Sequence, residues 1–360
     1  MPKLKALFRK DLQLTILIFV TIGILLAMAL VLGEKMYNTR NFSSMSFQIS
    51  EFAVLSIGMG LVMLLGGIDL SIVSNANLAG ILAAFVLSNE GLGETLGTSG
   101  LIVLAVIVAI GSATVCGMFN GVLIAKFSVN PIVATLGTMI LYNGISMAAT
   151  GGQGITNLPE EFVSFGTGTL IGLPYVFLLF IAIAIVLVIV MDRTGFGHKI
   201  YMIGENHTAS RFSAINNEKT IILTYAIAGL MAGFSALMIV ARVNSAKVGY
   251  GDTYLLQAIL VCVLAGISPS GGKGKVIGII LALFCIQILQ SAFTLWQFTP
   301  YAKKLIWGIM LLGLLFLNMA IDRMDVKKQK KLLKQQQMQA ADTVSGVQAS
   351  ADTLSGGTKA

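Results

Sequence analysis

Apolar runs of about twenty residues recur along the chain, and this is the length that an α-helix needs to cross the hydrocarbon core of a membrane. Of the 360 residues, 56% are hydrophobic and only 11% are charged, whereas a soluble domain is nearer a quarter charged. The chain has room for about ten such runs, and it lacks the alternating segments of an outer-membrane barrel. The sequence therefore predicts an all-α, polytopic integral membrane protein.

One apolar run, Glu51–Ser88, has 38 residues and is too long for a single straight span. It is broken at Gly66-Gly-Ile-Asp-Leu-Ser71, where a glycine pair can close one helix and Asp69 or Ser71 can cap the next. We therefore expect two helices to meet at this break. The ten expected spans are Leu14–Leu32, the two halves of Glu51–Ser88, Gly100–Ala125, Ile132–Thr150, Ile171–Met191, Thr220–Ala241, Leu255–Ile267, Val276–Phe293 and Lys304–Ile321.

Three parts of the chain differ in composition. Residues 1–13 form a basic N-terminal segment, residues 14–322 form the membrane domain, and residues 323–360 form a tail that opens with the basic patch Lys327–Lys334. The tail is poor in apolar residues, so we expect it to be disordered. Polar loops are expected within the membrane domain at Gly33–Ser50, Asn89–Ser99 and Gly151–Gly172.

The longest polar insert within the membrane domain is Asp192–Lys219, which separates two strongly apolar halves of the chain. Asn206 can accept hydrogen bonds from the free amides that open a helix, and Thr208 is a second candidate cap. Residues 209–215 then make about two turns, with Ala209, Phe212 and Ile215 on one side. This loop is predicted to carry a short surface helix, which a connector between spans can also have without any further role.

The formal charge of +8 reflects the ends of the spans and not a face for nucleic acid. With ten spans and the N-terminus inside, 18 of the 24 Lys and Arg residues fall on the cytoplasmic side. The six on the outer side are Lys35, Arg40, Arg242, Lys247, Lys303 and Lys304. We therefore expect both termini and the Asp192–Lys219 loop in the cytoplasm, and we expect no nucleic-acid partner.

No residue pattern in the chain indicates an enzyme or a cofactor site. The three cysteines and two histidines lack the spacing of metal ligands. The segment Gly266–Lys273 resembles a phosphate-binding loop, but no Ser or Thr follows the lysine, so the nucleotide-binding spacing fails. The glycine pairs Gly117/Gly121 and Gly229/Gly233 fit close helix packing.

Asp69 is the one acidic residue that lies well inside the apolar runs, where a charge is costly unless it faces protein, water or a pathway. It either lines a translocation route or only caps the helix after the break, and the residues leave both interpretations open. The polar residues that could line such a route are Asp69, Asn75, Asn77, Asn120, Asn143, Gln287 and Gln290. Each of them could instead be an interhelical contact.

Four segments together resemble the ribose-type permeases of binding-protein-dependent ABC importers, the second carbohydrate-uptake class. They are the GGIDLS run at 66–71, Asn130-Pro-Ile-Val-Ala-Thr-Leu-Gly-Thr138, Gly204-Glu-Asn-His-Thr-Ala-Ser-Arg-Phe-Ser-Ala-Ile215 and the GG-x-G turn at 271–274. The likeness covers roughly residues 10–322. The chain departs from the family at Tyr254-Leu-Leu-Gln-Ala-Ile-Leu260, where two usual carboxylates are missing, and this leaves the substrate open.

The resemblance implies a membrane permease subunit in the cytoplasmic membrane of a bacterium, importing a monosaccharide or a related compound. Its implied partners are a second permease subunit, a cytoplasmic ATPase that holds ATP and Mg²⁺, an extracytoplasmic solute-binding protein and the lipid bilayer. The implied contacts with the ATPase are Gly204, Asn206, Ala209, Arg211, Phe212, Ser213 and Ile215. The alternative is an ion-coupled secondary transporter, which usually needs several buried ionisable groups.

Overall fold

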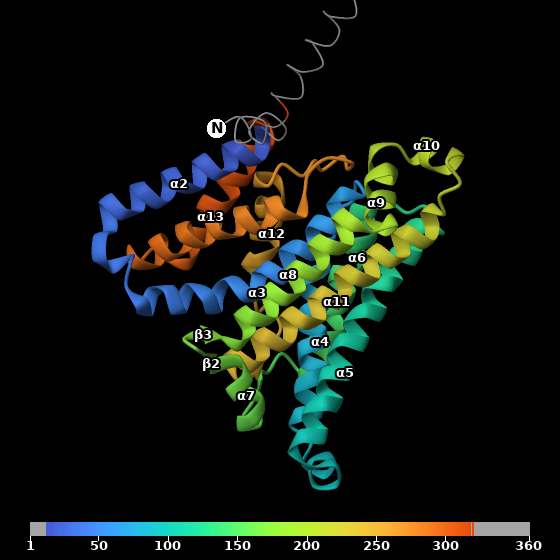
Figure 1. The fold of residues 1–360 in the computed structure, drawn as a ribbon. Helices are drawn as coiled ribbons and strands as arrows, with labels where there is room; N and C mark the ends of the chain where they lie inside the picture. The colour runs from blue at the N-terminus through green and yellow to red at the C-terminus, as the bar shows by residue number, and fades with distance from the viewer. Residues whose placement is uncertain (1–11, 318, 320–360) are drawn as a thin grey trace, which may run out of the picture. The chain divides into compact units, whose positions relative to one another are not determined.

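A computed structural model describes residues 12–317 and 319 of the chain. Most of the basic N-terminal segment and the whole tail at 323–360 lie outside the described residues. The chain separates into two compact units, residues 1–311 and residues 312–360. The first unit is a bundle of long helices, drawn in Figure 1.

The described residues contain ten apolar helices, which confirms the predicted all-α membrane fold. Eight of them are long and apolar enough to cross a membrane, and two, α4 and α12, are shorter. The ten are α2 (Leu12–Leu32), α3 (Thr39–Leu64), α4 (Ile72–Leu87), α5 (Glu90–Ala125), α6 (Pro131–Thr150), α8 (Tyr175–Arg193), α11 (Asn217–Val243), α12 (Asp252–Leu264), α13 (Val276–Leu295) and the unlabelled helix Pro300–Leu317.

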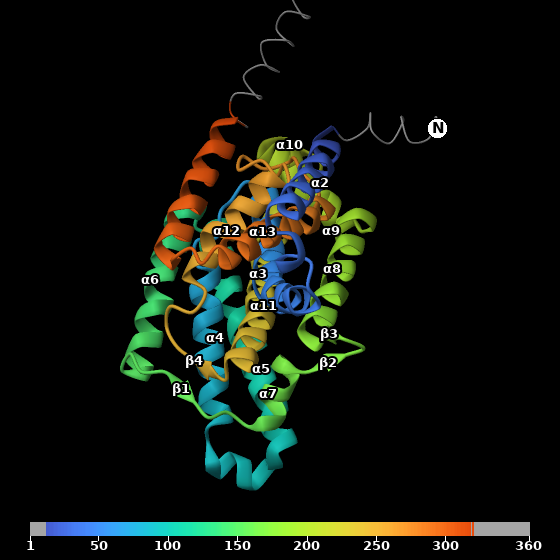
Figure 2. The same cartoon turned by 90° about the vertical axis from the view of Figure 1, so that its left-hand side faces the viewer.

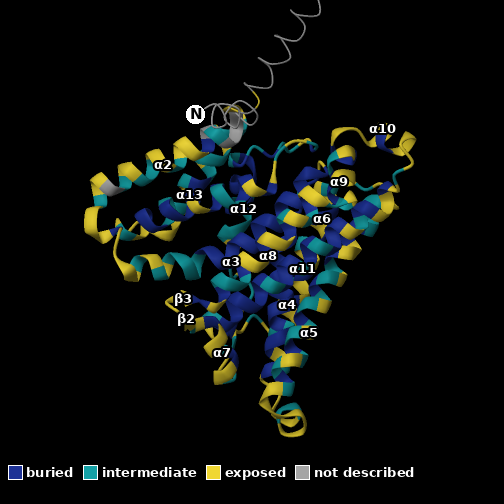
Figure 3. Cartoon of the chain, in the orientation of Figure 1, coloured by how far each residue is buried: buried dark blue, intermediate teal, exposed yellow. Residues whose placement is uncertain are grey.

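Helices α3 and α11 form the centre of the bundle. Every residue of α3 from Ile49 to Leu64 is buried, and α11 is buried along most of its length (Figure 3). Helix α11 packs along α5, α3 and α4, and its approach to α5 is close because glycines face each other. A Cβ on Gly117 would overlap the carbonyl oxygen of Tyr225 and press on Gly229, so these small residues serve helix packing as predicted.

The segments that carry α10 and α7 lie at two opposite ends of the bundle, which Figures 1 and 2 show at top and bottom, whereas the connection between α2 and α3 lies at the left side of Figure 1. The α10 end carries α9 (Gly195–Glu205) and α10 (His207–Phe212). The α7 end carries α7 (Glu160–Thr167) and two small antiparallel strand pairs. Strand β1 (Ile155–Thr156) pairs with β4 (Ser245–Ala246), and β2 (Thr169–Leu170) pairs with β3 (Leu173–Pro174).

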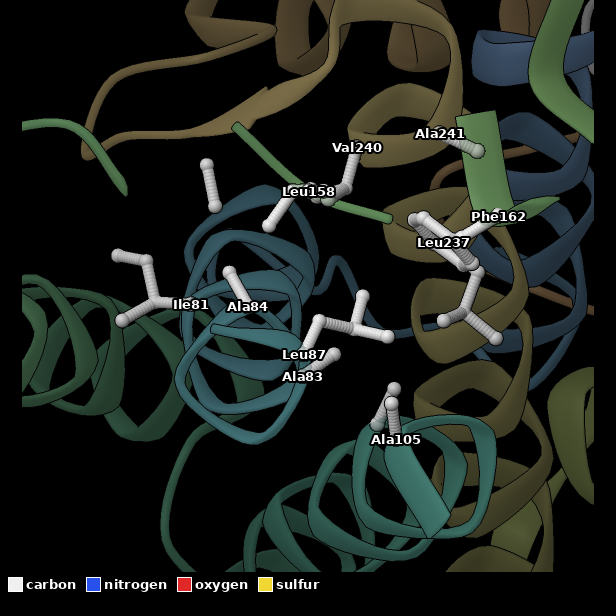
Figure 4. Packing of buried hydrophobic residues seen from close by; sticks show 12 residues of the cluster. Ile81, Ala83, Ala84, Leu87, Ala105, Leu158, Phe162, Leu237, Val240 and Ala241 are labelled. Atoms are coloured by element: carbon white, nitrogen blue, oxygen red, sulfur yellow. The ribbon is translucent and has the colours of Figure 1, made fainter. Parts of the chain in front are cut away.

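A hydrophobic cluster fixes the α7 end of the bundle. Leu158 and Phe162, from the segment between α6 and α8, pack among small and branched side chains of α4, α5 and α11, such as Ala84, Ala105 and Leu237 (Figure 4). Burying two large side chains in this way removes apolar surface from water and holds the irregular segment against the helices. The loop at this end is therefore a packed structure.

Several predicted loop boundaries were wrong because helices extend into polar sequence. Helix α3 begins at Thr39, after the short 3₁₀ helix η1 (Gly33–Lys35), so most of the predicted Gly33–Ser50 loop is helical. Asn89 caps α5, which continues through the predicted Asn89–Ser99 loop with a kink at Gly97. Helix α8 differs in the opposite direction and begins later than the predicted span, at Tyr175, because Ile171 lies in the turn of the β2–β3 hairpin.

Candidate functional site

Helix α10 is a short, solvent-facing helix in the predicted Asp192–Lys219 loop. The side-chain oxygen of Asn206 accepts hydrogen bonds from the amides of Thr208 at 2.9 Å and Ala209 at 3.0 Å, which confirms Asn206 as the cap and excludes Thr208. The helix ends at Phe212, earlier than predicted. Ala214 adopts a left-handed conformation with φ +57°, so Ile215 lies beyond the helix and is not on one face with Phe212.

Asn217 in the first turn of α11 holds α10 in place. Its amide nitrogen donates to the carbonyl oxygen of His207 at 3.0 Å and to the hydroxyl of Ser210 at 2.9 Å. Ser210 and Asn217 are both buried. Because a buried polar side chain without these partners costs free energy, the network fixes α10 against α11. On neighbouring α9, burial raises the pKa of the Tyr201 phenol to about 12 and Asp192 adds to the rise, so Tyr201 remains neutral.

The outer face of α10 carries a large apolar side chain in solvent. Phe212 is 88% exposed, and Arg211 beside it is also exposed. Arg211, His207 and Thr208 line one wall of a hollow of about 400 Å³. The other walls are the first turn of α11, the turn between α5 and α6, and the backbone near Gly66. The α10 surface therefore offers an apolar anchor beside a polar recess.

Three glycine-rich segments meet behind α10 with their backbones in direct contact. The amide of Gly272 donates to the carbonyl oxygen of Leu64, the last residue of α3, at 2.9 Å. A Cβ on Gly204 would overlap that same carbonyl oxygen, and a Cβ on Gly271 would press on the backbone of Gly66. The end of α3, the end of α9 and the turn at 271–274 therefore form one junction that only glycines permit.

The segment at 130–138 joins the same junction through Thr135 on α6. Its hydroxyl donates to the carbonyl oxygen of Ile68 and accepts from the amide of Leu70, both at 3.1 Å. All four segments that resemble the permease family thus lie together at the α10 end of the bundle. Sequence order places them up to about 200 residues apart, so only the fold brings them together.

Asp69 is buried at the break between α3 and α4, close to this junction. Its oxygen Oδ1 accepts hydrogen bonds from the amide of Ser71 at 2.9 Å and the hydroxyl of Ser71 at 2.6 Å. The Ser71 hydroxyl also accepts from the side-chain amide of Asn120 at 2.8 Å. This chain of contacts agrees with a capping role for Asp69, and it leaves the proposed pathway role as a prediction.

The other predicted pathway residues divide into two groups. Asn75 and Asn77 lie buried on α4, where the Asn75 amide donates to the carbonyl oxygen of Ala113 at 2.9 Å, and Asn143 is half-buried on α6. Gln287 and Gln290 lie on α13, which packs against α2, α3, α8 and α12. Gln287 donates to Gln48 on α3 at 3.3 Å. The structure therefore links Asp69 to Asn120 of α5 through Ser71, it bonds Asn75 separately to α5, and it places the two glutamines on another helix.

A second buried carboxylate, Glu51, corrects the prediction that Asp69 is alone. Glu51 forms an ion pair with Arg242 at the end of α11, including a bond from Arg242 Nη2 at 2.9 Å, and accepts from the hydroxyl of Tyr254 at 2.8 Å. The sequence placed Glu51 at the edge of a span because the preceding residues are polar. Only the helical start at Thr39 makes it an interior residue.

Across residues 12–317 and 319, no group of three or more His, Cys, Asp or Glu side chains is arranged to hold a metal ion. The site therefore consists of a short exposed helix, a glycine junction and buried amide and carboxylate groups.

Comparison with known proteins identifies the family. The family model described as the branched-chain amino acid transport system / permease component matches residues 41–315. The ribose import permease protein RbsC of Haemophilus influenzae is 32% identical over 299 residues, covering 82% of this chain and 90% of that protein.

Two further relatives are named for other substrates. The galactose/methyl galactoside import permease protein MglC of Haemophilus influenzae is 32% identical over 326 residues, covering 87% of this chain and 95% of that protein. The autoinducer 2 import system permease protein LsrD of Photorhabdus temperata is 31% identical over 280 residues, covering 75% and 81%. No solved structure gave a significant match. The chain is therefore a multi-pass membrane permease that belongs to the family of branched-chain amino acid transport system / permease components.

Proposed function

We propose that this chain is the transmembrane permease subunit of an ATP-driven ABC importer that takes up a small polar solute, a monosaccharide or a related compound. The observation that carries the proposal is the α10 surface, with Phe212 exposed on a short helix that Asn206 caps and Asn217 fixes. The solute class is supported by the relatives, whose names are those of import permeases for ribose, galactose and methyl galactoside, or autoinducer 2.

The contacts behind α10 explain how a partner could move the membrane helices. A helix of six residues has few contacts of its own, so a partner that binds Phe212 would supply the missing burial. Displacement of α10 reaches α9, and the packing of Gly204 against Leu64 transfers it to the end of α3 and the Asp69 break. Backbone-to-backbone contacts cannot absorb the displacement by a change of rotamer.

The partners proposed are those that an importer of this kind requires. A cytoplasmic ATPase would hold ATP and Mg²⁺ and bind α10, a second permease subunit would complete the pathway, and an extracytoplasmic solute-binding protein would deliver the solute. This chain would carry no cofactor. The excess of Lys and Arg on the α10 side supports a bacterial cytoplasmic membrane orientation with both termini and α10 inside.

Uptake measurements distinguish the proposal from the ion-coupled alternative. The second buried carboxylate, Glu51, is the reason to test that alternative, because ion-coupled transporters usually need several buried ionisable groups. A strain deleted for this gene and the same strain carrying it are compared for uptake of labelled ribose, galactose, methyl galactoside and autoinducer 2. We expect uptake of at least one compound to depend on the gene, to stop when ATP is depleted, and to survive a protonophore at constant ATP. Uptake that stops with the protonophore while ATP is unchanged would support the secondary transporter instead.

A further inference from the structure

The buried ion pair of Glu51 and Arg242 joins the two ends of an irregular segment. Arg242 is in the last turn of α11 and Tyr254 is in the first turn of α12, and both bind the Glu51 carboxylate. The segment between them, residues 244–251, is called the lip below. Glu51 on α3 thus holds both ends of the lip, and the hydroxyl of Ser235 on α11 donates to the Glu51 carbonyl oxygen at 2.6 Å.

The lip lies at the α7 end of the bundle, where its strand β4 pairs with β1. Helix α11 leads to it from the α10 end over 27 residues, which is about 40 Å at 1.5 Å per residue. Because the hydrocarbon core is about 30 Å thick, the lip is at the end of the membrane domain opposite α10.

The lip satisfies part of its polar backbone and side chains internally. Its residues Ser245 and Ala246 form strand β4 against β1, and the hydroxyls of Ser245 and Tyr250 lie 2.8 Å apart. Asn244 accepts a hydrogen bond from the amide of Leu158 at 3.1 Å. Lys247, by contrast, is exposed. This side of the lip therefore faces solvent at the α7 end.

The lip also covers a polar position on α4. Lys247, Tyr250 and Asn77 line a hollow of about 10 Å³ between the lip, α4 and α11, which is close to the size of one water molecule. Within the described part of the chain nothing hydrogen-bonds the side-chain nitrogen of buried Asn77. An amide that faces such a hollow, beside a hydroxyl and an ammonium, suits a hydroxyl-rich solute once the lip and α4 separate.

We propose that Glu51 is a positioning residue for solute transport, which fixes the lip through Arg242 and Tyr254 so that the lip forms one wall of the solute pathway. The inference rests on the proposed function. A buried ion pair seldom stabilises a fold more than apolar side chains of similar volume do. The presence of the ion pair here is explained by the positions that it imposes on the two ends of the lip.

The first part of the test measures stability. It separates the role of Glu51 in balancing the charge of Arg242 from its role in positioning the lip. The variants are Glu51→Leu, Arg242→Met and the double variant that carries both changes. Each single change leaves one charge unpaired. Arg242→Met is expected to lower the melting temperature more, because the remaining Glu51 side chain is 1% exposed whereas that of Arg242 is 30% exposed. The double variant should regain the wild-type melting temperature in detergent.

The second part measures where the lip is. Lys247→Cys is labelled on intact cells with a membrane-impermeant maleimide, in the wild-type and the double-variant background, with the unmodified chain as blank. We expect the double variant to change the labelling rate by about fivefold or more, because a lip freed from Glu51 samples open conformations. Uptake per permease molecule should fall by about tenfold.

Matched variants define the specificity of these effects. Arg40→Gln removes an exposed arginine from the same helix as Glu51 and should change neither the labelling rate nor uptake. Tyr254→Phe removes the hydrogen bond from Tyr254 to Glu51, one of the contacts that hold the lip, and should have an intermediate effect. If the double variant labels and transports like the wild type, Glu51 only balances the charge of Arg242 and the proposal is overturned. If the wild type imports none of the four labelled compounds, the proposed function fails, and the pathway role of the lip fails with it. The labelling rates would still decide whether Glu51 positions the lip.

Discussion

The amide of Gly272 donates a hydrogen bond to the carbonyl oxygen of Leu64 at 2.9 Å, and Gly204 packs against the same carbonyl. This contact joins the end of α3 to the turn that precedes α13 and to the end of α9, which leads into α10. Because the contact is between backbones, it is specific to the fold and tolerates no side chain.

The first prediction concerns Gly204→Ala. The added Cβ would overlap the Leu64 carbonyl and press on the Gly272 amide, and neither atom can rotate away. We expect a loss of at least about 2 kcal/mol in the free energy of unfolding, as in other overpacked sites. The melting temperature of the detergent-purified protein measures it. Gly195→Ala is the control, because its Cβ would meet nothing within 4 Å. Equal melting temperatures for the two variants would contradict the junction.

The second prediction concerns Phe212→Asp. Since Phe212 is 88% exposed, the change should leave the purified permease abundant and monodisperse. Association with the ATPase and solute uptake should both fall, because the apolar anchor is lost. The control is Ile171→Asp, which places the same charge at a 98% exposed apolar position at the α7 end and should leave ATPase association unchanged. A Phe212→Asp variant that still copurifies with its ATPase and supports wild-type uptake would exclude the docking role of α10.

The third prediction distinguishes the two roles of Asp69. Asp69→Leu leaves the amide and hydroxyl of Ser71 without their acceptor, which costs about 1–3 kcal/mol and should lower abundance. Asp69→Asn keeps an acceptor oxygen and should keep abundance, since Asn is nearly as good a cap. If the carboxylate also serves the pathway, uptake by Asp69→Asn falls at normal abundance. Wild-type uptake by this variant, or an equal loss of abundance in both, would leave Asp69 with the capping role alone.

The fourth prediction concerns orientation. A membrane-impermeant maleimide applied to intact cells should label Ile171→Cys, at the α7 end, and should not label His207→Cys until the cells are permeabilised. Both positions are exposed, so access to the reagent decides the result. The distribution of Lys and Arg is the basis of this prediction. Labelling of His207→Cys on intact cells would contradict the proposed orientation.

The sequence alone predicted the class of the fold and several local features. Apolar runs predicted the ten apolar helices of the described residues, eight of which are long and apolar enough to cross a membrane, because the free energy of burying a span in lipid is a property of a contiguous segment. The cap at Asn206 and the helix end at Gly66, which has φ +87°, were also predictable, because their hydrogen bonds and dihedral angles involve residues that are near neighbours in the sequence.

Helix boundaries in polar sequence were less predictable. Helix α3 begins at Thr39 although its first turns are polar, because these turns pack against other helices: Asn41 accepts from Ser291 and Gln48 accepts from Gln287 on α13. Tertiary contacts thus override the local signal for a loop. This error in the boundary is also the reason that Glu51 was not recognised as an interior residue.

The tertiary structure alone decided which polar groups meet. Glu51 and Arg242 are separated by 191 residues in the chain, and no local pattern indicates that α3 and α11 pack with these two positions at one level. The glycine junction of Leu64, Gly204 and Gly272 likewise exists only after two helices and a turn have packed. The insertion of each helix depends on its own composition, whereas the partner of each buried charge depends on the packing of all the helices together.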